Sequence, residues 1–205
     1  MSLRLDPRDG AVVLVLPHRV PLGQAIAFAH DHSAWLASRL AALPHRIAFA
    51  DGATVPVAGQ PHLLRHDPQG RCGVWAADGL IHVSGRSEHF ARRVADWLKT
   101  RARADITRQA PPLAAAVGGR IAQIRLRDTR SRWGSCNARG HLAFSWRLVL
   151  APPEVLGYVV AHEVCHLVEM NHSPAFWRLV ETLTPDSATA RHWLKRHGAD
   201  LHRYG

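Results

Sequence analysis

Two histidines and a glutamate stand in the run His162-Glu163-Val164-Cys165-His166, which has the pattern H-E-x-x-H. Residues four apart on a helix lie about 40° apart around its axis and one turn along it, so both imidazoles can share one metal ion. Glu163 lies about 100° round the axis, where it can reach a water bound to that ion. We therefore predict that His162 and His166 are metal ligands and that Glu163 is a general base.

A third ligand is expected at His172, ten residues after His162. His172 can reach the same ion only if the helix ends near Met170 or Asn171 and the chain then folds back. Asn171 tolerates the left-handed conformation that ends helices, and the following Pro174 disfavours helix just before it. Glu169 is the alternative ligand, because it would share the face of His162 if the helix continued. It could instead orient a histidine from outside the ligand set.

The donor set favours Zn²⁺, one ion per chain, because imidazole suits zinc and hydrolysis needs no redox change. Zinc would lower the pKa of a bound water toward about 7, and Glu163 would pass the water proton to the leaving group. Cys165 is expected to pack as a small apolar residue rather than to bind metal. Arg132, Tyr158 and His192 are candidates for stabilising an oxyanion. Core packing of Tyr158 and a surface position of His192 are the simpler interpretations.

The elements around these residues predict an α+β fold. Proline suits a first helical turn and an acid suits its positive end, so a helix should open at Pro152-Pro153-Glu154. Alternating side chains predict strands over 124–127 and 142–148, with a turn at 137–140. A last helix is expected over 185–197, with Thr184 as its cap and Gly198 as its stop.

The first half predicts a smaller strand and helix region. Short strands are expected over 11–16, 46–49, 54–57 and 62–64, a hairpin over 74–75 and 80–83, and helices over 22–43 and 87–109. Pro111-Pro112 should end the second helix. Gly118-Gly119 then marks the predicted boundary between region 1–117 and region 118–205.

The composition is that of an ordinary globular protein, with 47% hydrophobic and 20% charged residues among 205. No apolar run is long enough for a membrane span. Three cysteines do not suggest a disulfide scaffold, so a reducing, cytoplasmic location is expected. The net charge of +10 favours a phosphate-rich or carboxylate-rich partner such as a nucleotide or nucleic acid, unless it reflects coding bias.

Three runs resemble the YgjP-like family of metal-dependent hydrolases, which is related to the SprT-like and WLM zinc peptidases. The runs are TRSRWGSC at 129–136, YVVAHEVCH at 158–166 and NHSPAFW at 171–177. The resemblance implies a zincin-like catalytic half, in which the H-E-x-x-H helix packs against a small twisted β-sheet. It also implies that His162, His166 and His172 bind zinc and that Glu163 is the base.

The same resemblance places the stretch from Arg130 to Cys136 along the site, as an edge strand or loop. An edge strand suits pairing with an extended peptide, so Arg132, Trp133, Gly134 and Ser135 are candidate substrate-binding residues. A purely structural role for this stretch is equally open.

The leading hypothesis is a zinc-dependent metallopeptidase that acts on peptides or unfolded proteins. A metal-dependent nucleoside triphosphate pyrophosphohydrolase is the first alternative, since members of the family have been described as such and arginines suit phosphate. Against it, the sequence has no Gly-rich phosphate loop, and three histidines favour zinc over magnesium. The second alternative is a basic, SprT-like protein that acts near nucleic acid, which rests on charge alone.

Overall fold

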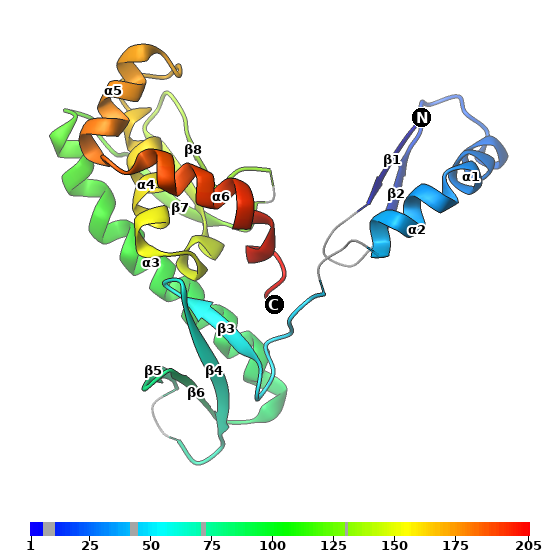
Figure 1. The fold of residues 1–205 in the computed structure, drawn as a ribbon, viewed down its shortest axis with the longest axis horizontal. Helices are drawn as coiled ribbons and strands as arrows, with labels where there is room; N and C mark the ends of the chain where they lie inside the picture. Colours follow the sequence, from blue (N-terminus) through cyan, green and yellow to red (C-terminus); the bar gives the residue numbers. More distant parts are fainter. Residues whose placement is uncertain (6–10, 42–44, 71–72, 130) are drawn as a thin grey trace. The chain divides into compact units, whose positions relative to one another are not determined.

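The computed structural model describes residues 1–5, 11–41, 45–70, 73–129 and 131–205. The chain divides into two compact units, Met1–Arg46 and Ile47–Gly205, each of which is described by itself (Figure 1). The boundary predicted between residues 117 and 118 falls inside the second unit, between a long helix and the strand that follows it. The mixed strands and helices confirm the predicted α+β class.

The first unit pairs a two-stranded antiparallel sheet with two short helices. β1 (Ser2–Leu5) pairs with β2 (Val12–Val15), and only β2 was predicted. The helix predicted over 22–43 is instead two helices, α1 (Leu22–Asp31) and α2 (Ser33–Ala41). The break falls at His32, whose ring bonds back to the Phe28 carbonyl at 2.8 Å, while residues 42 and 43 lie outside the described part.

The second unit begins with a four-stranded sheet in the order β3-β4-β6-β5. Its strands are β3 (Thr54–Val57), β4 (Gln60–Asp67), β5 (Val74–Ala77) and β6 (Leu80–Ser84). The predicted hairpin is confirmed, because β5 and β6 are antiparallel around a turn with positive φ at Asp78 and Gly79. The strand predicted over 46–49 is wrong. Ile47 forms one bridge, to Tyr204, and within the described part of the chain no strand extends this pairing.

Helix α3 (Phe90–Ala116) follows a short 3₁₀ turn, η1 (Ser87–His89), and runs through Pro111-Pro112. The prediction that these prolines end the helix is therefore wrong. Both prolines are exposed, so water can reach the carbonyls that lack an amide donor. The opposite face stays buried through Ile106, Ala110 and Ala114, and this packing outweighs the cost of the prolines.

A second sheet has the order β7-β9-β8, with β7 (Gln123–Arg127) parallel and β8 (Gly134–Cys136) antiparallel to β9 (His141–Ser145). β8 is thus an edge strand. The strand predicted over 142–148 ends early, at Ser145, whose hydroxyl accepts a hydrogen bond from the Arg147 amide. A 3₁₀ helix, η2 (Trp146–Leu150), follows. All five of its residues are buried, so their apolar pattern reflects the core rather than a strand.

Three helices complete the unit: α4 (Pro153–Cys165), α5 (Pro174–Leu183) and α6 (Ser187–Leu201). Figure 1 shows α4 in yellow between α3 in green and α6 in red, and α4 also contacts α5 and β8. The helix start at Pro153 is confirmed, and α5 was not predicted. Thr184 closes α5 rather than opening the last helix, and α6 continues through Gly198, which packs against Trp133. No described helix combines the length and apolar character needed to cross a membrane.

Arg147 joins the end of β7 to the last residues of the chain. Its side chain is almost fully buried and donates from Nε to Asp128 Oδ1 at 2.7 Å. Nη1 donates to the carbonyls of Leu201 and Tyr204 at 3.1 and 2.6 Å. Burial alone would raise the pKa of Asp128, but the hydrogen bond and charge of Arg147 outweigh it and hold that pKa below its ordinary value of 3.8.

We expect the ion pair of Asp128 with Arg147 to make the protein measurably less stable in acid than at neutral pH. The Asp128 carboxylate stabilises the fold at neutral pH, and this contribution is lost as the pH falls below 3.8 and through the folded pKa. Asp128→Asn should therefore lower the free energy of unfolding by about 1 kcal/mol near pH 7, since Asp128 is partly exposed. The difference from the wild type should shrink toward zero in acid.

Urea unfolding followed by circular dichroism between about pH 7 and about pH 2 measures this difference. Asp105→Asn, which removes a surface ion pair with Arg108 on α3, is the matched control. An equal loss of stability for Asp128→Asn at both ends of the range would contradict the role of this pair.

Candidate metal centre and cleft

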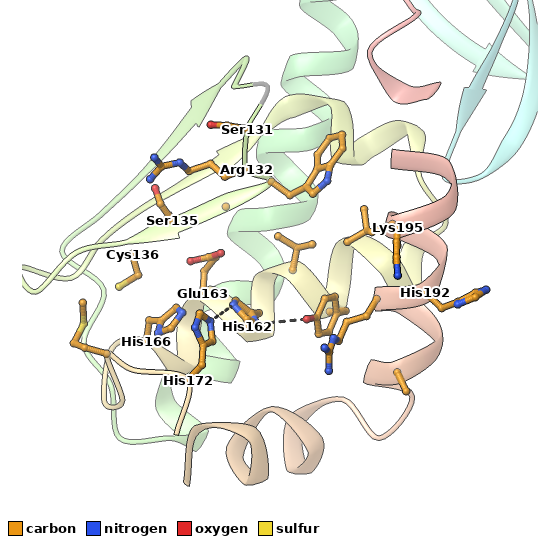
Figure 2. A pocket seen from close by; sticks show the side chains of 18 residues that line it. Ser131, Arg132, Ser135, Cys136, His162, Glu163, His166, His172, His192 and Lys195 are labelled. Atoms are coloured by element: carbon orange, nitrogen blue, oxygen red, sulfur yellow. Dashed lines mark hydrogen bonds between the residues drawn. The ribbon is translucent and has the colours of Figure 1, made fainter. Parts of the chain in front are cut away.

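The three predicted histidines meet at one point in the structure. His162 lies in the last turn of α4, His166 directly follows α4, and His172 lies after the next turn. One ring nitrogen from each lies within 4.8 Å of the others, and the Nε2 atoms of His162 and His172 are 3.1 Å apart. Figure 2 shows the three rings grouped beside Glu163. Among the described residues, neither Glu169 nor Cys165 belongs to this group.

The chain reverses direction earlier than the sequence predicted. α4 ends at Cys165 rather than near Met170, and a turn follows in which the Glu169 amide donates to the Cys165 carbonyl at 2.9 Å. Asn171 does not adopt the expected left-handed conformation. Ser173 then caps α5 by accepting from the Phe176 amide at 3.1 Å. Because α4 ends at Cys165 and Ser173 starts α5, the chain between them turns His172 back toward α4.

Two of the three histidines have a partner at the ring nitrogen that faces away from the cluster. His166 Nδ1 donates to the Glu169 carbonyl at 2.9 Å, and His162 Nδ1 lies 3.4 Å from the Tyr158 hydroxyl. The sequence offered two roles for Glu169, as a metal ligand or as a residue that orients a histidine. Glu169 contacts His166 in the second way, but through its backbone carbonyl rather than its side chain. Such outer partners fix the imidazoles with their other nitrogens toward a shared ligand, so the donor set fits a metal ion.

An aromatic surface supports all three rings. The ring of the fully buried Phe176 lies between 4.5 and 4.9 Å from each of the three imidazole centroids. Burial lowers the pKa of His162 to about 4, helped by the charges of His166 and His172. Burial likewise lowers the pKa of His166. Both rings are therefore neutral near pH 7, which is the form that binds metals.

Glu163 is held against the backbone of the edge strand. Its side chain is buried but lines the cleft, and burial raises its pKa to about 7, opposed by the charge of Arg132. A Cβ atom placed on Gly134 would lie 2.6 Å from Glu163 Oε1 and 2.7 Å from its Cδ. Only glycine leaves room for this carboxyl group, so Gly134 sets its position.

A cleft with a volume of 1010 Å³ contains this cluster. Its walls are the stretch 131–136 on one side and α6 on the other, with α4 between them. The candidate substrate-binding residues Arg132, Trp133, Gly134 and Ser135 all line it, and β8 confirms the expected edge strand. Arg130 lies outside the described residues.

The other residues singled out in the sequence divide between cleft and core. Tyr158 and His192, the remaining oxyanion candidates, also line the cleft. Cys165 is fully buried in the core, which confirms its expected packing. Sequence reasoning missed Arg191 and Lys195, which line the cleft from α6. The sequence offered only the helical stripe of Ala188, Arg191, His192 and Lys195, and such a stripe is equally typical of a solvated face.

The chain matches the YgjP-like metallopeptidase domain family over residues 1–197 and belongs to that family. Curated proteins gave no match. The metallopeptidase zymogen of Pyrococcus abyssi abylysin is a similar solved structure, with 21% sequence identity over 49% of this chain and 92% of that chain. Its TM-score is 0.33, which does not define a common fold.

The contact between Gly134 and Glu163 predicts a sharp effect of one methyl group. If Glu163 is the base that the sequence predicts, Gly134→Ala should displace its carboxyl group and lower hydrolytic activity by about 100-fold, because misplaced catalytic groups lose rate steeply. Metal content should stay unchanged, since the added methyl group meets the carboxyl group rather than an imidazole.

Gly157→Ala is the control on α4, where the added methyl would meet only the Gln109 side chain, at 3.3 Å. Steady-state kinetics and metal analysis of both variants test the contact. Full activity of Gly134→Ala would show that the position of Glu163 does not depend on Gly134.

Proposed function

We propose that this member of the YgjP-like metallopeptidase domain family is a zinc-dependent peptidase. The observation that supports it is the meeting of three imidazoles and one buried carboxyl group in a cleft bordered by an edge strand. His162, His166 and His172 would hold the ion. When bound, Zn²⁺ supplies a Lewis acid that acidifies water and polarises a carbonyl oxygen.

Glu163 moves the proton in this proposal. Its carboxyl group lies in the cleft beside the histidines, shielded from bulk water, and its raised pKa of about 7 suits both accepting and releasing a proton near neutral pH. As the carboxylate it takes a proton from the attacking water. As the acid it returns that proton to the amine that leaves when the peptide bond breaks.

The edge strand gives a reason to favour peptides. β8 pairs with β9 on one side, and its residues Gly134, Ser135 and Cys136 line the cleft. The amides and carbonyls at its outer edge can pair with an extended peptide, which would cross the cleft beside Glu163. A peptide bound in this way is positioned through its backbone and therefore without regard to most of its side chains.

The deciding experiment measures metal content and hydrolysis together. The wild type and Glu163→Gln would be analysed for zinc and then given an unfolded protein, a peptide library and nucleoside triphosphates. We expect about one zinc per chain in both proteins, because Glu163 is not a ligand. Peptide cleavage should fall by about 100-fold or more in the variant, because its amide cannot accept the proton.

Other results would contradict the proposal. Pyrophosphate release that depends on Glu163, without peptide cleavage, would favour the nucleotide hydrolase. If the protein binds no metal after zinc is supplied, the peptidase proposal has no basis. Loss of metal in Glu163→Gln would contradict the role of Glu163 as a base outside the ligand set.

The third ligand has its own test. His172→Ala should weaken zinc binding by about 100-fold or more, because one of three ligands is lost. Glu169→Ala should have a much smaller effect, because its backbone orients His166 and its carboxylate bonds Ser173 at 3.3 Å. Competition with a chromogenic zinc chelator measures both affinities. The reverse order of effects would make Glu169 the ligand.

A further inference from the structure

The wall of the cleft formed by α6 carries two cations that the proposed chemistry does not use. Arg191 and Lys195 both line the cleft, one helical turn apart. The Arg191 guanidinium lies 4.6 Å from the centroid of the Trp177 ring, and Trp177 stacks on His172. Arg191 is therefore next to the histidine cluster, and Lys195 lies one turn further along the wall. Figure 2 shows Lys195 on α6, across from Arg132 and Ser135.

No described carboxylate neutralises these cations. Neither Arg191 nor Lys195 has an Asp or Glu oxygen of the described residues within 4.0 Å. The one acidic residue among those that line the cleft is Glu163, whereas Arg132 adds a third cation on the opposite wall. A substrate entering this cleft meets a positive surface, which favours negative charge on the substrate.

The spacing of the two cations fits an extended peptide. Four residues of α-helix advance about 6 Å along the axis. Two residues of an extended strand advance about 6.6 Å, and side chains two apart point the same way. Two side chains separated by one residue can therefore reach Arg191 and Lys195 at the same time.

We propose that Arg191 and Lys195 select peptides with acidic side chains at two positions separated by one residue. This inference rests on the proposed peptidase function and names its substrate class. Arg191 binds the acidic side chain nearer the cleaved bond, because it lies beside the histidines. Lys195 binds the outer one. Recognition of this kind acts mainly on substrate binding and weakens with salt.

The test uses zinc-loaded enzyme and one host peptide into which a Glu-x-Glu pair is placed at successive positions around the cleaved bond. Matched peptides carry Gln or Lys at the outer position. At one placement, wild type should cleave the Glu peptide with a kcat/KM about tenfold above the Gln peptide, mostly through KM and less so at high salt. Lys195→Glu should lose this preference and favour the Lys peptide.

Lys99→Glu is the matched control, because Lys99 is the other lysine of the chain and lies exposed on α3 outside the cleft. It should keep the wild-type preference. Metal content and circular dichroism establish that each variant is folded, and Lys195→Gln replaces Lys195→Glu if the reversal prevents folding. With Lys195→Gln, the Glu and Gln peptides should be cleaved equally well at the outer position.

The outcomes separate this inference from the proposed function. Cleavage of all peptides at equal rates, or an unchanged preference in Lys195→Glu, would overturn the acidic specificity and leave the peptidase intact. Failure of the zinc-loaded wild type to cleave any peptide would overturn the peptidase itself. Hydrolysis of nucleoside triphosphates that depends on both Glu163 and Lys195 would assign the cations to phosphate and also overturn the inference.

Discussion

Helix α4 must be covered on nearly every side, and the rest of the second unit follows from that constraint. Nine of its 13 residues are buried, among them Val155, Val160 and Val164, so no broad face is left for water. α3, α5, α6 and the second sheet accordingly pack around α4. Polar side chains on such a helix are tolerated only where its neighbours leave an opening. His162 and Glu163 lie at that opening, which is the cleft.

The grouping of the candidate residues could be predicted from the sequence because it depends on helical geometry. The spacing of His162 and His166 is enough to bring their rings together, and the meeting with His172 needed only a reversal of the chain. The way the chain reverses was predicted wrongly. α4 ends at Cys165, and Ser173 caps the next helix. Both features belong to a short turn, and the periodicity of apolar residues does not predict where such a turn begins or ends.

Other errors share one cause, which is that buried packing overrides local preference. The alternation that suggested a strand through Leu148 continues into a buried 3₁₀ helix. The prolines in α3 are accommodated because its opposite face is buried. Arg191 and Lys195 could not be assigned from the sequence, since charges on a helix usually indicate a solvated face. Only the packing of α6 beside α4 shows that this face borders the cleft.

The contact of Phe176 with all three imidazoles has a consequence for the entropy of metal binding. Side chains that must be immobilised when a ligand arrives cost about 0.5–1.5 kcal/mol each. Here one buried ring restrains three histidines at once, and outer hydrogen-bond partners restrain two of them further. Most of that ordering is completed when the core folds. An incoming ion would meet a preorganised site, and its affinity would depend on coordination rather than on the cost of arranging its ligands.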